Sequence, residues 1–142
     1  IPGDDEETGR RMKSGRDHVV PLSKRALAII AQAEELAPKS DLIFPDTETG
    51  QVMSENRFLT IRDALGFKKE VCTPHGFRSS FRDWVAEETN FPPEVAEKAL
   101  AHVIKSKTEA AYRRGYLLAK RAELMEAWAK YATAEGEATS DA

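Results

Sequence analysis

The chain has 142 residues, of which 41% are hydrophobic and 32% charged, and its formal net charge at pH 7 is -3. That composition excludes a fully disordered or fibrous protein, and the length suits one domain or a large part of one. No apolar run approaches the ~18 residues that span a bilayer, and the acidic first residues are unlike a signal peptide. The single cysteine, Cys72, excludes an internal disulfide framework and fits a reducing compartment such as the cytoplasm.

The charges are unevenly distributed along the chain. Residues 1–9 and 134–142 are acidic, and we expect both segments to be loop-like or disordered. Basic residues form one group between residues 10 and 25 and another between residues 98 and 121: Arg10, Arg11, Lys13, Arg16, Lys24 and Arg25, then Lys98, Lys105, Lys107, Arg113, Arg114, Lys120 and Arg121. These groups can bind a polyanion, although on charge alone a solvated, charge-mixed surface is the simpler interpretation.

A small β element and a helix are predicted first. Residues 9–22 favour β structure, with a turn at 14–15 and a strand at 19–20. Ser23 is a favourable N-cap for a helix over 24–37. Its apolar residues recur at helical spacing and predict an inward face: Ala26, Leu27, Ile30, Ala33 and Leu36.

A second helix follows after an apolar extended segment at 42–45 and a polar loop. Ser54 predicts the start of this helix, which covers about 55–65, and Gly66 marks its end. Its predicted inward residues are Phe58, Ile61, Ala64 and Leu65.

The remainder of the chain predicts further helices. A threonine followed by proline at 73–74 is a strong helix start, and that helix should reach about Glu88. The other helices are expected over 93–100, from about 107 with a kink at Gly115, and over 117–133, with a break near His102. The fold class is therefore mainly α, with a small β-hairpin or sheet near the N-terminus.

His75 and Arg78 are three residues apart at the start of a predicted helix. That spacing places them on one face, at the end where the helix dipole favours an anion. A guanidinium and an imidazole suit a phosphate, because arginine donates a bidentate pair of hydrogen bonds and histidine can exchange a proton. Taken alone, this spacing arises by chance in many helices.

Three other residues have side chains suited to chemistry on a phosphate. His102 is followed ten residues later by Tyr112, which is flanked by arginines that can lower the pKa of a phenol and favour its use as a nucleophile. Lys13 lies on the predicted hairpin, from which it can reach a bound phosphate. Each of the three, considered singly, is equally compatible with an ordinary packing or surface role.

Together these motifs resemble the catalytic domain of tyrosine recombinases, in particular the prophage and genomic-island integrases. The resemblance rests on their order along the chain: R-M-K-x-x-R-x-H-x-V-P-L-S at 11–23, H-G-F-R at 75–78, L-A-H at 100–102 and A-A-Y at 110–112. It covers about residues 10–131. It implies the DNA breaking-rejoining fold and a bacterial, cytoplasmic and nucleoid-associated protein.

The resemblance also implies a mechanism and its residues. Tyr112 would attack a DNA phosphodiester and form a 3′-phosphotyrosine, without metal, ATP or any other cofactor. Arg78, His75 and His102 would contact the phosphate, and Lys13 would protonate the leaving 5′-oxygen. Other basic residues would bind DNA phosphates: Arg11, Arg16, Lys105, Lys107, Arg113 and Arg114. The expected partners are duplex attachment sites, further copies in a tetramer, and an accessory directionality factor.

One element of the family pattern has no match. The family's first catalytic arginine precedes the hairpin, where this sequence has only acidic, loop-like residues. We therefore expect residues 10–133 to be the C-terminal portion of an integrase catalytic domain that is inactive by itself. The final helix is predicted to pack either on a neighbouring protomer or on its own core.

Other functions remain open from the sequence. A type IB topoisomerase shares the same set of residue types, and a DNA-binding remnant would bind without cutting. A Cys72–His75 hydrolase lacks an oxyanion-hole signature, and a cysteine is more often a small buried residue. A zinc site lacks the paired-ligand spacing; its candidate ligands would be Cys72, His75, His102 and His18.

Overall fold

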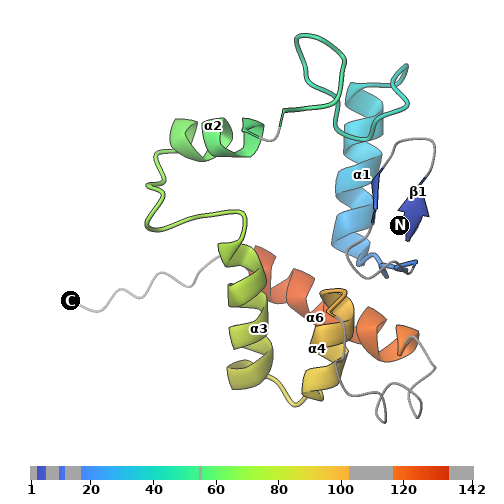
Figure 1. Cartoon of the computed structure of the whole chain (residues 1–142), viewed down its shortest axis with the longest axis vertical. Helices are drawn as coiled ribbons and strands as arrows, with labels where there is room; N and C mark the ends of the chain where they lie inside the picture. Colours follow the sequence, from blue (N-terminus) through green and yellow to red (C-terminus); the bar gives the residue numbers. More distant parts are fainter. Residues whose placement is uncertain (1–2, 6–9, 12–16, 55, 103–116, 135–142) are drawn as a thin grey trace.

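A computed structural model describes residues 3–5, 10–11, 17–54, 56–102 and 117–134 (Figure 1). Its elements are β1 (Asp4–Asp5), β2 (Arg10–Arg11), α1 (Lys24–Leu36), α2 (Arg57–Ala64), α3 (Gly76–Glu88), α4 (Pro93–Ala99) and α6 (Leu118–Thr133). The described part of the chain is therefore mainly helical, as predicted. None of its helices is long and apolar enough to cross a membrane.

The β structure differs from the prediction. β1 and β2 pair antiparallel, with Asp4 opposite Arg11 and Asp5 opposite Arg10, so one strand comes from the acidic segment that we expected to be loop-like. The predicted strand at 19–20 is wrong, because residues 17–23 form no strand. The backbone there bonds to a helix instead, since the Val19 carbonyl accepts a hydrogen bond from Arg121 of α6. The predicted turn at 14–15 lies outside the described residues.

Two of the helix boundaries follow the predicted local signals, and one does not. Ser23 caps α1 as predicted, its hydroxyl accepting a hydrogen bond from the Ala26 amide at 3.2 Å. Gly66 follows α2 with a φ of 79°, the left-handed conformation that glycine adopts readily. The predicted cap at Ser54 is wrong, because the N-cap of α2 is Asn56, whose side chain makes no capping bond.

The core lies where α3, α4 and α6 meet, in the lower part of Figure 1. Its buried apolar residues are Phe81, Trp84, Val85, Val95, Ala96 and Leu124. Aromatic rings extend it along α6: the Trp84 centroid lies 5.2 Å from that of Trp128 and 5.3 Å from that of Tyr131. The final helix therefore packs on the chain's own core, which was one of its two predicted roles.

The inward faces predicted for α1 and α2 are not buried. Neither helix has a buried residue within the described ranges. Leu36 is 87% exposed, and Phe58 and Ile61 are 45% and 46% exposed. Amphipathic spacing shows which face a helix can bury, but burial requires an opposing element. α1 meets α6 at one end, where the Lys24 amide donates to Glu126 Oε2 at 2.9 Å.

Candidate active site

The start of α3 holds two of the predicted site residues. Thr73 Oγ1 accepts a hydrogen bond from the Gly76 amide at 2.9 Å, and the helix begins at Gly76 rather than at Pro74. His75 is therefore the N-cap residue, and the Arg78 amide donates to its carbonyl at 3.1 Å. A Cβ at position 76 would lie 3.0 Å from Thr73 Oγ1, so glycine suits this tight turn. Both His75 and Arg78 are exposed, as an anion site requires.

Arg78 joins α3 to the segment after α4. Its Nη2 atom donates to the Leu100 carbonyl at 2.9 Å and lies 2.9 Å from His102 Nε2. A guanidinium NH₂ group has two hydrogens, so both bonds form together. Both contacts use Nη2. The guanidinium also carries N–H donors on Nη1 and Nε, which are suited to hydrogen bonds with an anion.

The chain direction after α4 places His102 beside Arg78. Ala101 has a φ of 56°, a left-handed conformation that is uncommon for a residue other than glycine. This turn brings the His102 amide back to donate to the Glu97 carbonyl at 2.9 Å. The imidazole is thereby held over the end of α4, with 38% of its side chain exposed.

Two residues that the sequence reasoning did not single out complete this network. His102 Nδ1 lies 2.6 Å from Glu97 Oε2, and Arg82 Nη2 lies 3.1 Å from Glu97 Oε1. Arg82 follows Arg78 by one helical turn, so both arginines face α4. Glu97 could have been noticed in the sequence, because it is a carboxylate five residues before His102 and lies near the end of a short predicted helix. We refer to Arg78, His102, Glu97 and Arg82 as the arginine–histidine network.

The structure brings Arg78 and His102 together and places His75 at the start of the same helix as Arg78, while most of the other predicted residues lie outside the described ranges. Lys13 and Tyr112 lie outside the described residues, as do four of the DNA-binding candidates: Lys105, Lys107, Arg113 and Arg114. Arg16 lies outside as well, and Arg11 belongs to β2. Within the described ranges, no group of three potential metal ligands comes together.

Arg121 was placed by its position in the sequence in the second group of basic residues, but it does not lie on the surface. Its side chain is 1% exposed, and burial lowers the pKa of its guanidinium. Nη2 donates to the Val19 carbonyl and lies 3.4 Å from His18 Nε2. Arg121 thus fastens the segment before α1 to α6, since a buried guanidinium is retained where it has hydrogen-bond partners.

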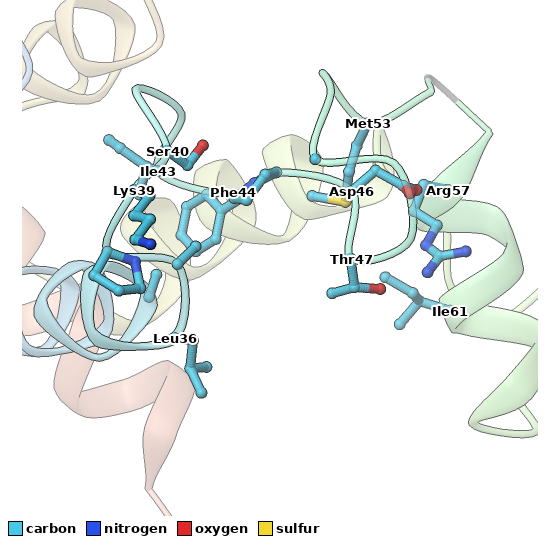
Figure 2. A pocket seen from close by; sticks show the side chains of 15 residues that line it. Leu36, Lys39, Ser40, Ile43, Phe44, Asp46, Thr47, Met53, Arg57 and Ile61 are labelled. Atoms are coloured by element: carbon cyan, nitrogen blue, oxygen red, sulfur yellow. The ribbon is translucent and has the colours of Figure 1, made fainter.

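A separate cavity of about 800 Å³ lies between the end of α1, the loop after it and α2 (Figure 2). Its labelled apolar side chains are Leu36, Ile43, Phe44, Met53 and Ile61, with Lys39 and Arg57 among the polar ones. None of His75, Arg78 and His102 lines it. The cavity is a continuation of the exposed apolar faces of α1 and α2, whereas acid–base and anion-binding groups gather at the arginine–histidine network.

The amino-acid sequence of this chain matches a family of known proteins. A model of the phage integrase family matches residues 5–117. The chain is 39% identical over 120 residues to prophage integrase IntA of Escherichia coli K12, covering 84% of this chain and 29% of that protein. It is 34% identical over 126 residues to the integrase of Enterobacteria phage P4, covering 86% of this chain and 28% of that protein.

The chain is also 32% identical over 135 residues to putative protein IntB of Escherichia coli K12, covering 92% of this chain and 34% of that relative. It thus spans about a third of the length of these curated relatives. No solved structure matches it significantly. The family match covers most of the chain, from β1 to the residue before α6, and so includes the arginine–histidine network. The chain therefore belongs to the phage integrase family.

Proposed function

We propose that the full-length protein containing this chain is a site-specific DNA recombinase, an integrase that cuts and rejoins duplex DNA through a 3′-phosphotyrosine. The observation that carries the proposal is the Arg78–His102 contact. These side chains are 24 residues apart in sequence, yet Nη2 and Nε2 are 2.9 Å apart. They come from the H-x-x-R and L-A-H motifs, and their convergence provides a cationic, hydrogen-bonding site whose chemistry suits a phosphate.

The chemistry assigns one role to each residue. The Tyr112 phenolate attacks the phosphorus, and the bond to the 5′-oxygen breaks as Lys13 transfers a proton to it. Arg78 neutralises charge on the non-bridging oxygens in the transition state. His102 donates a hydrogen bond to one of those oxygens, and His75 exchanges a proton beside the phosphate. Attack by another 5′-hydroxyl reverses the step and rejoins the strands, so the bond energy is conserved.

The partners follow from the same chemistry. Arg11, Arg16, Lys105, Lys107, Arg113 and Arg114 bind backbone phosphates, which position the duplex without reading its sequence. The full-length protein assembles as a homotetramer on paired attachment sites in the nucleoid, and an accessory factor sets the direction of recombination. The 142-residue chain by itself forms little covalent adduct, because Arg78 alone must offset charge that the family spreads over two arginines.

Covalent trapping tests the proposal. A nicked suicide duplex bearing a candidate attachment site is incubated with full-length protein, and the adduct is measured on a denaturing gel. Tyr112→Phe removes the nucleophilic oxygen and keeps the ring, so the adduct should disappear while DNA affinity is unchanged. Tyr116→Phe is the matched control and should still form adduct.

The outcomes separate the proposed recombinase from its rivals. Peptide mapping of the wild-type adduct should place the nucleotide on the peptide that contains Tyr112. Duplex relaxation without strand exchange would indicate a type IB topoisomerase instead. DNA binding with no adduct in the wild type would indicate a non-catalytic DNA-binding protein, and the proposal would then be wrong.

A further inference from the structure

The Nδ1 side of His102, opposite the nitrogen that contacts Arg78, lies against the carboxylate of Glu97. Its Nδ1 lies 2.6 Å from Glu97 Oε2, a short distance typical of a charge-assisted hydrogen bond. The other carboxylate oxygen, Oε1, is 3.1 Å from Arg82 Nη2. The Glu97 carboxylate is thus fixed at both oxygens, by a helix α3 residue on one side and by the imidazole on the other.

These contacts determine which ring nitrogen of neutral His102 bears the proton. An ionised carboxylate only accepts hydrogen bonds, so Nδ1 must be the protonated nitrogen. Nε2 then has a lone pair, which accepts the hydrogen bond from Arg78 Nη2 at 2.9 Å. The opposite tautomer would set a lone pair against the carboxylate and an N–H against the guanidinium. Glu97 and Arg78 therefore favour the same tautomer from opposite sides of the ring.

Binding of a phosphate changes what Nε2 must do. A phosphate oxygen is an acceptor, so Nε2 can contact it only after taking up a proton, which solvent supplies to the 38% exposed ring. The resulting imidazolium needs a negative partner on its far side. Glu97, with 30% of its side chain exposed, lies where it can stabilise that charge without touching the phosphate itself.

We propose that Glu97 is a positioning residue for His102: it holds the ring as the Nδ1–H tautomer and stabilises the imidazolium that donates from Nε2 to the scissile phosphate. Arg82 holds the second oxygen of Glu97 and so orients the carboxylate. This inference rests on the proposed recombinase function. A carboxylate behind a functional histidine fixes its tautomer and orientation in the same way at other enzyme and metal sites.

The first experiment reads the tautomer directly and needs no catalysis. Nitrogen-15 NMR of histidine-labelled full-length protein, at a pH where imidazole is neutral, reports which ring nitrogen carries hydrogen, and His102→Gln assigns the signal. The proton should be on Nδ1, whereas free imidazole side chains favour Nε2–H. A wild-type His102 with its proton on Nε2 would overturn the proposal. In Glu97→Ala, the hydrogen-bonded Nδ1 proton signal should be lost.

The second experiment measures adduct formation on the suicide duplex. Glu97→Gln keeps the size of the side chain but removes its charge, and its single amide oxygen can face Arg82 or His102 but not both. We expect adduct formation to slow by about 10- to 100-fold, by analogy with the effect of removing the carboxylate behind a metal-binding histidine. Glu87→Gln, an exposed change on α3, is the matched control and should keep the wild-type rate.

The outcomes distinguish this inference from the proposed function. DNA affinity measured by anisotropy should be equal in wild type, Glu97→Gln and Glu87→Gln, because Glu97 acts through His102. An unchanged rate in Glu97→Gln, in a wild type that forms adduct, would overturn the role of Glu97 and leave the recombinase proposal intact. Absence of adduct in the wild type would contradict the recombinase proposal, while the NMR experiment would still test the His102–Glu97 contact.

Discussion

His18 lies against the buried guanidinium of Arg121, with Nε2 and Nη2 3.4 Å apart. Burial lowers the pKa of His18, and the positive charge of Arg121 lowers it further, while a hydrogen bond with the Ala99 backbone acts in the opposite direction. At this position the neutral imidazole can accept a hydrogen bond from Arg121, whereas the imidazolium would be repelled. The state of His18 therefore affects how the segment before α1 is held on α6.

The lowered pKa of His18 predicts a pH-dependent stability. Between the folded pKa and the unfolded value of about 6.5, the unfolded chain binds more protons, so the free energy of unfolding rises with pH. Stabilisation should be complete above about pH 6.5 and lost as the pH falls through that window. The midpoint temperature of thermal unfolding should therefore fall more between pH 7 and pH 5 in the full-length wild type than in His18→Gln, which lacks this titrating group. An equal pH dependence in both proteins would show that His18 does not cause the change in stability.

At the scale of elements, α6 organises the described part of the fold. It packs on α4 and α1, and its Leu124 is 0% exposed, in contact with the core built from α3 and α4. The same helix supplies Arg121 and Glu126, which bond the backbone of the segment leading into α1. One helix therefore joins the α3–α4 core, which carries the arginine–histidine network, to the N-terminal part.

Truncation of Leu124 should reveal this role. Leu124→Ala leaves a cavity at a fully buried position and should lower the free energy of unfolding by about 2–5 kcal/mol. Leu118→Ala on the same helix is the matched control and should have a much smaller effect, because that side chain is 45% exposed. Urea unfolding of the full-length variants measures the loss in the free energy of unfolding at each position. Similar losses at the two positions would show that burial on α6 is not what stabilises this part of the protein.

At the scale of the whole molecule, charge is segregated, so a chain that is acidic overall still carries local groups of basic residues suited to a polyanion. The formal net charge is -3, yet the basic candidates for phosphate contact gather in two groups. Burial of Arg121 removes one residue from the second group, and Lys98 at the end of α4 remains in it. Affinity for a polyanion depends on such local groups of charge rather than on the net charge.

Salt dependence tests the basic groups. Binding of full-length protein to duplex DNA should weaken with salt, with a negative slope of several units in log K against log salt, because each phosphate contact releases counterions. Lys105→Ala with Lys107→Ala should reduce that slope by about two units, one for each lost contact. Lys69→Ala, which removes an exposed lysine outside both groups, should leave the slope unchanged. A flat slope for the wild type would contradict DNA binding through these residues.

Local sequence signals determined most of the helices and where they begin and end. Ser23 and Gly66 act on the backbone within a few residues, so the start of α1 and the end of α2 could be predicted closely. The position of His75 and Arg78 one helical turn apart at the start of α3 was predictable for the same reason. The order of the motifs pointed to the integrase family, to which the chain belongs. Lys13 and Tyr112 stay predictions, since they lie outside the described residues.

Tertiary structure alone decided which of these side chains meet and which are buried. Arg78 reaches His102 across 24 residues because α3 packs on α4 and the chain turns back at Ala101. The same packing brings Arg82 to Glu97, a pair that no local spacing relates. It also buries Arg121, which its sequence neighbours placed in a basic surface, and leaves the predicted apolar face of α1 at most half-buried. Local preferences act over one or two turns of backbone, whereas contacts between helices depend on how their faces pack, and this is settled only in the folded chain.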